Sequence, residues 1–317
     1  TATTEIYTLS LHDALPIYQA RVLAIETPYP ALDQAFQWAQ ISIERAWVRV
    51  EGLGRGLVAG FAPSGDGERP GQAWFFDGDA LTASRALTAT GDFAGAREIL
   101  RFAAAHQRAD GKLMQELTLS AGWCRWFEDY PFAFGAGTTN ADFVIALDFH
   151  ARFSGDLELT RELMPTVKKA MEWCERALDS EGRLTHGSAV APSGARAKQA
   201  LASEVFQQGA WIAALGAAVR LAQAVGEDPT PYRALEERAR AAFEGFWSEE
   251  RGHYGFGLLH HPVLRLLHHP LEPAADGGAE QIAPVRGGGE EGHRGKLGAQ
   301  GRGRIGAWAP GRFDLPR

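Results

Sequence analysis

The chain has 317 residues, of which 45% are hydrophobic and 22% are charged, so it is long enough to bury the core of one large domain or two ordinary ones. Its formal net charge of -7 argues against a nucleic-acid partner, because phosphates attract a basic surface. No apolar run approaches the roughly 20 residues of a membrane span, which argues against a membrane protein and favours a soluble one. Cys124 and Cys174 have no disulfide or metal-ligand spacing, and we expect both to be buried as small hydrophobes.

The two ends of the chain differ in composition from its middle. Residues 1–17 lack the basic start and the cleavage site of a signal peptide and resemble a translated sequencing adapter, so we exclude them from the fold. Residues 259–317 are rich in Gly, Pro, His and Arg without periodicity, which indicates either a shifted reading frame or a disordered tail. Residues 18–258 are expected to form the folded domain. No localisation signal is recognisable, so the cytoplasm is only the default.

Apolar residues recur at helical spacing through the middle of the chain and predict helices in consecutive pairs. The expected pairs are 79–90 with 93–107, 139–154 with 165–178, and 204–225 with 229–246, preceded by a single helix at 30–49 and with a short helical turn at 157–163. Pro165 would stand in the first turn of its helix, where the missing N–H costs nothing. No stretch with strand periodicity is long enough to build a sheet.

The pairs repeat a sequence pattern. "TGDFAGAREIL" (90–100) and "SGDLELTRELM" (154–164) share a glycine followed by an aspartate, which is typical of a helix end followed by an N-cap. A further glycine, typical of a turn, follows each pair, at Gly111, Gly182 and Gly252. Repeated hairpins of this size indicate either a solenoid or a closed toroid.

Long connections separate the pairs and distinguish these two architectures. Residues 50–78, 108–138 and 183–203 would all lie on one side of the helix pairs, whereas a solenoid keeps its loops short. Connections of this length inside a compact domain are usually functional. We therefore expect an all-α toroid of inner and outer helices with a site at one mouth.

Each long connection carries aromatic and acidic residues to that mouth. Aromatic rings pack on the apolar face of a sugar, and carboxylates bind its hydroxyl groups. Cleavage of a glycosidic bond needs two carboxyl groups, one as acid and one as base or nucleophile. The expected carbohydrate-binding residues are Trp74, Phe76, Asp79, Glu116, Trp126 and Glu204.

The motif order resembles a known family. "RPGQAWFFDGDALTASRAL" (69–87), followed by "QRADGKLMQEL" (107–117), is similar to the six-hairpin glycosidases of the glycogen-debranching, amylo-1,6-glucosidase-like group, in which an aromatic-aromatic-Gly-Arg-Asp sequence opens an inner helix. The resemblance covers about residues 30–258. It implies an (α/α)6 toroid, here incomplete, and an inverting hydrolase of α-glucosidic bonds that needs no metal or organic cofactor.

The resemblance implies a role for some residues, whereas at other positions this sequence departs from the family's pattern. Asp79 matches the family's sugar-binding aspartate, and Glu116 matches the glutamate after "DGK". Asp77 and Gly78 replace the family's Gly and Arg, so one guanidinium contact to the sugar is absent. Gln115 replaces the histidine before Glu116.

The general acid is assigned to Asp142. A gapless alignment sets Thr138 against the family's catalytic aspartate, and Asp142 follows one helical turn later on the same helix face. Glu204 resembles the acid that opens the third inner helix and would contact substrate. The partner base of the family lies further along the chain and is not assigned.

Plainer interpretations and other functions remain open. Asp77, Asp79, Asp142 and Glu204 could be helix-start charges that complement the helix dipole, Glu116 a solvated loop carboxylate, and the tryptophans covers over the core. A sugar epimerase or polysaccharide lyase would favour His or Tyr as proton carriers, and few stand at the mouth. A non-catalytic helical-hairpin scaffold would have short loops, and a truncated toroid would turn over nothing. The oligomeric state is not indicated.

Overall fold

The structure, a computed structural model, describes residues 22–60, 73–130, 132–185, 201–259 and 266–267. All of them lie within residues 1–274, which form one compact unit. Residues 1–17 and nearly all of residues 259–317 lie outside the described residues. The expected boundaries at residues 17 and 258 therefore stay predictions.

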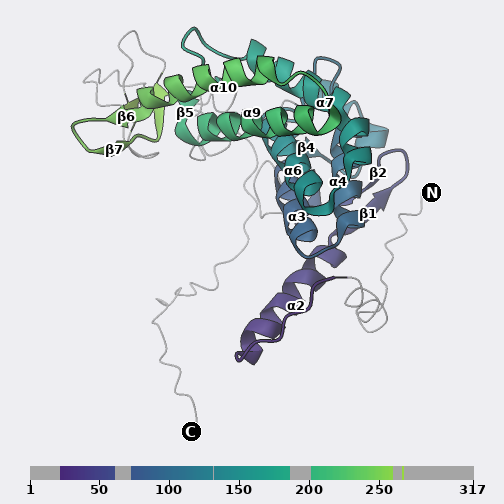
Figure 1. The fold of residues 1–317 in the computed structure, drawn as a ribbon. Helices are drawn as coiled ribbons and strands as arrows, with labels where there is room; N and C mark the ends of the chain where they lie inside the picture. The colour runs from purple at the N-terminus through teal and green to yellow at the C-terminus, as the bar shows by residue number, and fades with distance from the viewer. Residues whose placement is uncertain (1–21, 61–72, 131, 186–200, 260–265, 268–317) are drawn as a thin grey trace, which may run out of the picture. The chain divides into compact units, whose positions relative to one another are not determined.

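Within the described ranges, six long helices form three consecutive hairpins, as the sequence predicts (Figure 1). The pairs are α3 (Asp77–Ala89) with α4 (Phe93–Ala105), α6 (Thr139–Ser154) with α7 (Leu157–Arg176), and α9 (Val205–Val225) with α10 (Thr230–Phe243). A further helix, α2 (Pro30–Arg45), precedes them and is largely exposed. No helix in the described part of the chain is both long and apolar enough to span a membrane.

The helices form an inner row and an outer row. Helices α3, α6 and α9 pack side by side in that order, and α4, α7 and α10 each pack against the first helix of their own hairpin. One main core cluster joins the inner row through Leu81, Phe143 and Trp211, each at most 1% exposed. Because inner and outer helices alternate along the chain, the fold is of the (α/α)6 toroid type, and the described residues supply three of its hairpins.

Aspartate caps begin the outer helices of the first two hairpins, as the Gly-Asp pattern predicts. Oδ1 of Asp92 accepts a hydrogen bond of 2.9 Å from the backbone N–H of Gly95, and Oδ1 of Asp156 accepts one of 2.9 Å from that of Leu159. Asp156 also forms an ion pair with Arg97 on α4. The second cap therefore links the outer helices of neighbouring hairpins.

Asn140 on α6 connects the first hairpin to the second. Its Oδ1 accepts a hydrogen bond from the backbone N–H of Leu113 (2.9 Å), and its Nδ2 donates to the backbone oxygens of Gly111 (3.0 Å) and Ala170 (3.1 Å). One buried amide therefore holds the glycine turn, the next inner helix and the next outer helix together.

Gln208 on α9 repeats this arrangement one hairpin later. Its Oε1 accepts from the backbone N–H of Leu184 (3.0 Å), and its Nε2 donates to the backbone oxygens of Gly182 (3.4 Å) and Ala239 (2.9 Å). The sequence repeat thus corresponds to a repeated tertiary contact, although Asn140 and Gln208 are different residue types.

Helix α7 runs without a break through Pro165, so the predicted helix start at this proline is wrong. The expected short turn at 157–163 is the beginning of the same helix. A proline removes one backbone hydrogen bond from a helix interior. Burial of an apolar stripe that includes Leu159 and Val167, both 0% exposed, accounts for the continuity.

Short strands are present, so the expectation that no sheet forms is also wrong. The helix expected at 30–49 ends at Arg45, and the alternating residues that follow it join a hairpin closed by a glycine turn. The antiparallel pairs are β1 (Trp47–Val50) with β2 (Gly54–Leu57), β3 (Phe75–Phe76) with β4 (Glu116–Leu117), β5 (Leu201–Glu204) with β8 (Gly257–Leu259), β8 with β9 (Leu266–Leu267), and β6 (Trp247–Ser248) with β7 (His253–Tyr254).

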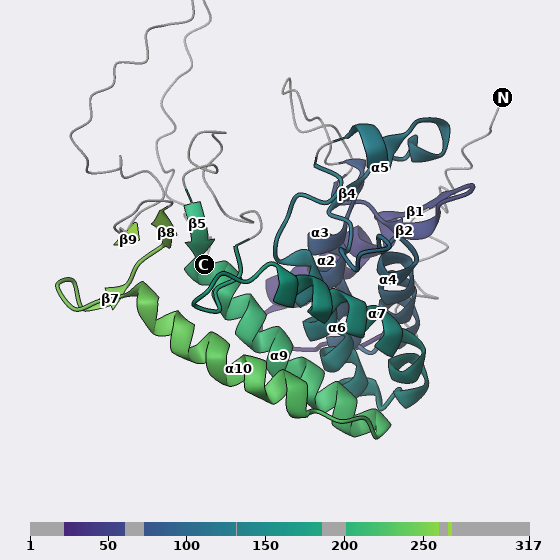
Figure 2. The ribbon, with the colours of Figure 1, turned by 90° about the horizontal axis from the view of Figure 1, so that it is seen from above.

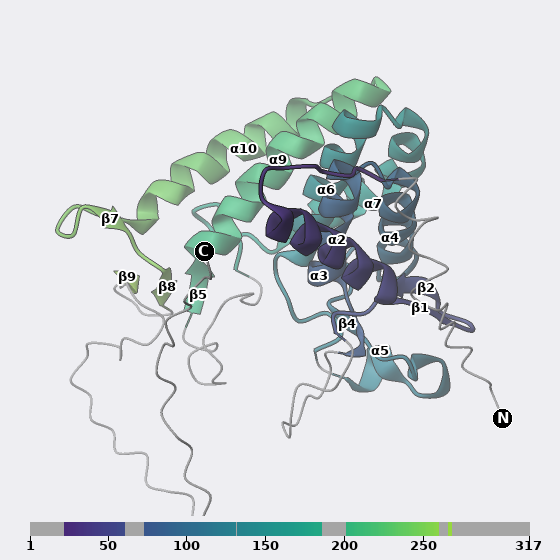
Figure 3. The same cartoon turned by 90° about the horizontal axis from the view of Figure 1, so that it is seen from below.

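The described parts of the long connections lie at one side of the inner row. Figures 2 and 3 show β4, the short helix α5 (Trp126–Asp129) and the β5–β8 ladder beyond the same ends of the helices. The Gly-Asp turns close the hairpins at the opposite end. The N-termini of α3, α6 and α9 therefore open toward the side that carries the aromatic and acidic residues.

Candidate functional site

The β3–β4 ladder brings the first two connections together at the start of α3. Phe76 stands opposite Glu116 in the antiparallel register, and the backbone N–H of Asp77 donates a hydrogen bond of 3.1 Å to the oxygen of Gln115. Two segments that are 40 residues apart in sequence are thereby joined. The acids that open α3 and the glutamate after "DGK" consequently belong to one site.

Glu116 is fully buried and held by two aromatic side chains. The hydroxyl of Tyr130 donates a hydrogen bond of 2.8 Å to its Oε2, and the indole Nε1 of Trp126 donates one of 2.8 Å to its backbone oxygen. The two rings stack with centroids 4.0 Å apart. Glu116 is therefore a fixed carboxyl group and not a solvated loop residue.

Trp74 completes an aromatic cluster beside this glutamate. Its ring meets Trp126 edge-on at 5.1 Å and Tyr130 edge-on at 6.0 Å. The structure thus brings together Trp74, Trp126 and Glu116, which the sequence analysis selected from two different connections. The sequence analysis assigned no role to Tyr130, and its position directly after the short helix α5 gives no signal of the contact.

The two aspartates at the start of α3 lie in different environments. Asp77 is 1% exposed, and its Oδ2 accepts no hydrogen bond from any residue that the structure describes. Burial raises the pKa of the Asp77 carboxyl from 3.8 to about 8, against the lowering effect of Lys112. Asp79 is exposed, and partial burial raises its pKa. Residues two apart point to different sides of a helix, so only Asp79 is presented to solvent.

Asp142 lies in the first turn of α6. Burial raises the pKa of its carboxyl, while a hydrogen bond from Thr138 and the positive charges of Arg85 and Lys112 lower it. Arg85 belongs to α3, so the two inner helices share this electrostatic environment. A carboxyl with a raised pKa retains its proton to higher pH, which is a requirement for a general acid.

Lys112 is a buried cation that the sequence analysis quoted within "DGK" without assigning it a role. It is 0% exposed, and its Nζ donates to the backbone oxygen of Leu113 (3.2 Å) and to Oδ1 of Asn140 (3.2 Å). Burial lowers the pKa of its ammonium from 10.5 to about 8. A charged residue directly after a turn glycine usually lies in solvent, so sequence alone did not single it out.

Glu204 is 1% exposed and ends β5, opposite Gly257, directly before α9. Glu204 directly precedes α9, the third inner helix. Asp79 and Asp142 belong to the first two inner helices, α3 and α6, and α6 packs between α3 and α9. The structure places Phe76 partly buried at the ladder and leaves Trp123 75% exposed.

The two cysteines differ in their exposure to solvent. Cys124 is exposed, contrary to expectation, because the connection around α5 lies on the surface, whereas Cys174 is buried. In the part of the chain that the structure describes, no group of three or more His, Cys, Asp and Glu side chains is arranged to hold a metal ion.

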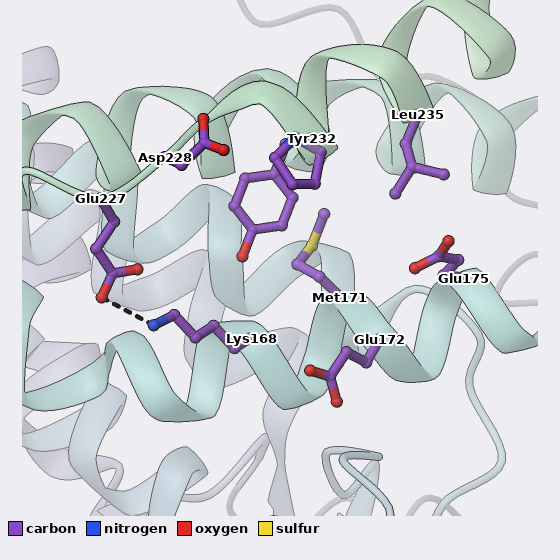
Figure 4. A pocket seen from close by; sticks show the side chains of 9 residues that line it. Lys168, Met171, Glu172, Glu175, Glu227, Asp228, Tyr232 and Leu235 are labelled. Carbon is purple, nitrogen blue, oxygen red and sulfur yellow. Dashed lines mark hydrogen bonds and ion pairs between the residues drawn. The ribbon is translucent and has the colours of Figure 1, made fainter.

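A surface groove of about 590 Å³ lies between the outer helices α7 and α10 (Figure 4). An ion pair of 2.8 Å between Lys168 and Glu227 closes one side of it. Its other lining residues are Met171, Glu172, Glu175, Asp228, Pro231, Tyr232 and Leu235. None of the predicted site residues lines this groove, so it is separate from the candidate site at the start of the inner helices.

The fold defines the class of protein as an (α/α)6-type array of helical hairpins. Among solved structures it is similar to a rhamnosidase from Klebsiella oxytoca with rhamnose bound, with a TM-score of 0.55, 19% sequence identity, and coverage of 76% of this chain and 43% of the rhamnosidase chain. A GH63 mannosylglycerate hydrolase from Thermus thermophilus matches with a TM-score of 0.45, 15% identity, and coverage of 70% and 66% of the two chains. No family model and no curated protein matches the sequence.

Proposed function

We propose that this chain carries the carbohydrate site of a glycoside hydrolase that cleaves an α-glucosidic bond in a glucan or oligosaccharide. The observation that supports this most is the buried Glu116 carboxyl, fixed by Tyr130 and Trp126 beside the ring of Trp74. A rigid carboxyl next to aromatic rings suits a sugar, which has an apolar face and a rim of hydroxyl groups. The likeness to the rhamnosidase supports the fold on which such a site is built.

In this proposal the carboxyl groups have different tasks. Asp142 is the general acid: its raised pKa favours the protonated form that can donate to the leaving oxygen. Asp79, exposed at the start of α3, and Glu116 bind hydroxyl groups of the sugar that is released. Trp74, Phe76 and Trp126 shape the apolar wall, and Glu204 contributes from the third inner helix. The base that activates water in an inverting reaction is not assigned.

The experiment is an assay of released reducing sugar from α-1,4 and α-1,6 glucans. Because the similar solved structures are named for rhamnose and mannosylglycerate, an α-rhamnoside and mannosylglycerate are tested in parallel. We expect hydrolysis of a glucan, and a loss of about 100-fold or more in Asp142→Asn, since general acid catalysis contributes roughly that factor. Asp228→Asn, an exposed aspartate in the α9–α10 turn, is the matched control.

The outcomes separate the proposal from its rivals. Hydrolysis of the rhamnoside or mannosylglycerate alone would keep the hydrolase and replace its substrate. An unsaturated product would indicate a lyase, and a folded protein that binds a glucan without cleaving it would indicate a binding scaffold. Equal activity of Asp142→Asn and the wild-type protein would remove Asp142 from the mechanism.

A further inference from the structure

The outer helix α7 packs differently against its two neighbouring outer helices. It is in direct contact with α4 on one side, whereas it makes hardly any contact with α10 on the other. The groove of about 590 Å³ described above occupies the space between α7 and α10 (Figure 4). In the described part of the chain, one junction between outer helices is therefore closed and the other is open.

Ion pairs connect the two helices at the closed junction. Arg97 on α4 pairs with Asp156, the N-cap of α7. One turn further along, Nε of Arg101 donates a hydrogen bond of 2.8 Å to Oε1 of Glu162. Arginines of α4 thus neutralise these two acids of α7.

The acids at the open junction are not matched in this way. The ammonium of Lys168 pairs with Glu227, in the turn between α9 and α10, at 2.8 Å. Further along α7, Glu172 and Glu175 are exposed and line the groove, but they form no ion pair or hydrogen bond with any residue that the structure describes. Asp228 adds a fourth carboxylate, so four carboxylates and one ammonium line the groove.

The surface between these charges is apolar. The side chains of Met171 on α7 and of Tyr232 and Leu235 on α10 extend into the groove (Figure 4). Met171 is 2% exposed, and the other two are partly buried. Burial, Glu227 and Glu172 raise the pKa of Tyr232, so its hydroxyl keeps its proton at neutral pH and can donate a hydrogen bond. The groove therefore combines an apolar floor with acidic edges.

A binding partner for this groove must combine an apolar face with positive charge. Its apolar side chains would leave water on the floor, and lysine or arginine side chains would reach the carboxylates while their aliphatic stems cover apolar surface. An acidic partner would be repelled. Glu172 and Glu175 lie about 4.5 Å apart along the axis of α7, which suits basic residues three or four positions apart on one face of a helix.

We propose that the groove between α7 and α10 is a docking site for a partner protein that presents a short amphipathic helix with basic residues beside its apolar face. An amphipathic helix in an apolar groove is a common mode of peptide recognition. None of the residues assigned to the sugar site lines the groove, so the inference does not depend on the proposed function.

The test is a fluorescence anisotropy titration of the full chain with a labelled helical peptide of leucine and lysine, in which the leucines form one face. We expect binding that weakens as the salt concentration rises. Glu172→Gln combined with Glu175→Gln should weaken it about fivefold, since two exposed ion pairs are lost. The matched control, Glu249→Gln combined with Glu250→Gln, changes two exposed glutamates outside the groove and should leave the dissociation constant unchanged.

Two further measurements test the apolar floor. Tyr232→Ala should weaken binding of the same peptide, because apolar contact area is lost. A peptide of equal charge with serine in place of leucine should bind the wild-type protein at least about fivefold more weakly, for the same reason. The serine peptide tests the floor even if Tyr232→Ala does not fold.

Several results would overturn the inference. One is the absence of binding, and another is equal affinity of the wild-type protein and the double variant at Glu172 and Glu175. Equal affinity for the serine peptide would indicate non-specific attraction, and equal affinity for a peptide with glutamate in place of lysine would show that charge does not select the partner. Sedimentation equilibrium covers the remaining occupant: a wild-type dimer that dissociates in Tyr232→Ala would assign the groove to a second copy of the chain.

Discussion

The hydroxyl group of Tyr130 donates a hydrogen bond of 2.8 Å to Oε2 of Glu116, which fixes a buried carboxyl beside the aromatic cluster. Removing that donor in Tyr130→Phe should weaken binding of a glucan oligosaccharide about tenfold, because the Glu116 carboxyl is then no longer fixed in one orientation, and one hydrogen bond contributes about 1 to 1.5 kcal/mol. Isothermal titration calorimetry measures the dissociation constant. Tyr254→Phe is the control, since that hydroxyl is exposed and reaches Glu244 only at 3.5 Å. Equal affinity of the two variants would contradict a role of Glu116 in binding.

The amide of Asn140 makes contacts to two hairpins at once, and its removal should destabilise the fold. In Asn140→Ala the backbone groups of Leu113, Gly111 and Ala170 lose a buried partner. We expect a loss of about 2 to 4 kcal/mol in the free energy of unfolding, measured by urea denaturation monitored by circular dichroism. Gln37→Ala, on the exposed part of α2, should change it by less than about 0.5 kcal/mol. A small effect of Asn140→Ala would mean that the repeated contact does not hold the hairpins together.

Two glycines at corresponding turn positions should respond differently to alanine. Both have a positive φ, +96° at Gly111 and +66° at Gly252, but a Cβ on Gly111 would overlap the backbone oxygen of Lys169, whereas one on Gly252 would meet no described atom within 4 Å. Gly252→Ala should cost about 1 to 2 kcal/mol for the left-handed backbone alone. Gly111→Ala should cost more than about 3 kcal/mol, because the helix α7 must also move. Thermal unfolding of the two variants measures the difference, and equal melting temperatures would argue against close packing of the turn on α7.

The buried carboxyl of Asp77 should make stability fall as pH rises. Its pKa is raised from 3.8 to about 8 in the folded protein, so between pH 4 and pH 8 the folded state binds more protons than the unfolded state. The free energy of unfolding therefore decreases across this window, by up to about 1.4 kcal/mol per pH unit for one proton. In Asp77→Asn this contribution is absent, and the variant should gain stability relative to the wild-type protein from pH 4 to pH 8. Urea unfolding at several pH values tests this, and a difference that is independent of pH would show that Asp77 ionises normally.

Sequence periodicity was sufficient to predict the helices and their pairing into hairpins. The three hairpins, the Asp92 and Asp156 caps and the glycine turns all depend on short-range rules, in which a residue's neighbours determine its conformation. The same rules failed at Pro165 and at the end of α2. At Pro165 the burial of apolar side chains outweighed the backbone hydrogen bond that a proline removes. At the end of α2, pairing of β1 with β2 decided where the helix ends.

The sequence by itself therefore determined the hairpin architecture and named most of the residues at the candidate site, including Glu116, Trp74 and Trp126. Only the tertiary structure decided which acids are buried and which are exposed: Asp77, treated from sequence as a possible helix-start charge, is almost fully buried, while Asp79 faces solvent. It also revealed Lys112, because the burial of a side chain and its interaction with other helices depend on packing between segments far apart in the chain. Charge type and spacing can be read from the sequence, but the desolvation that shifts a pKa arises only when the helices pack together.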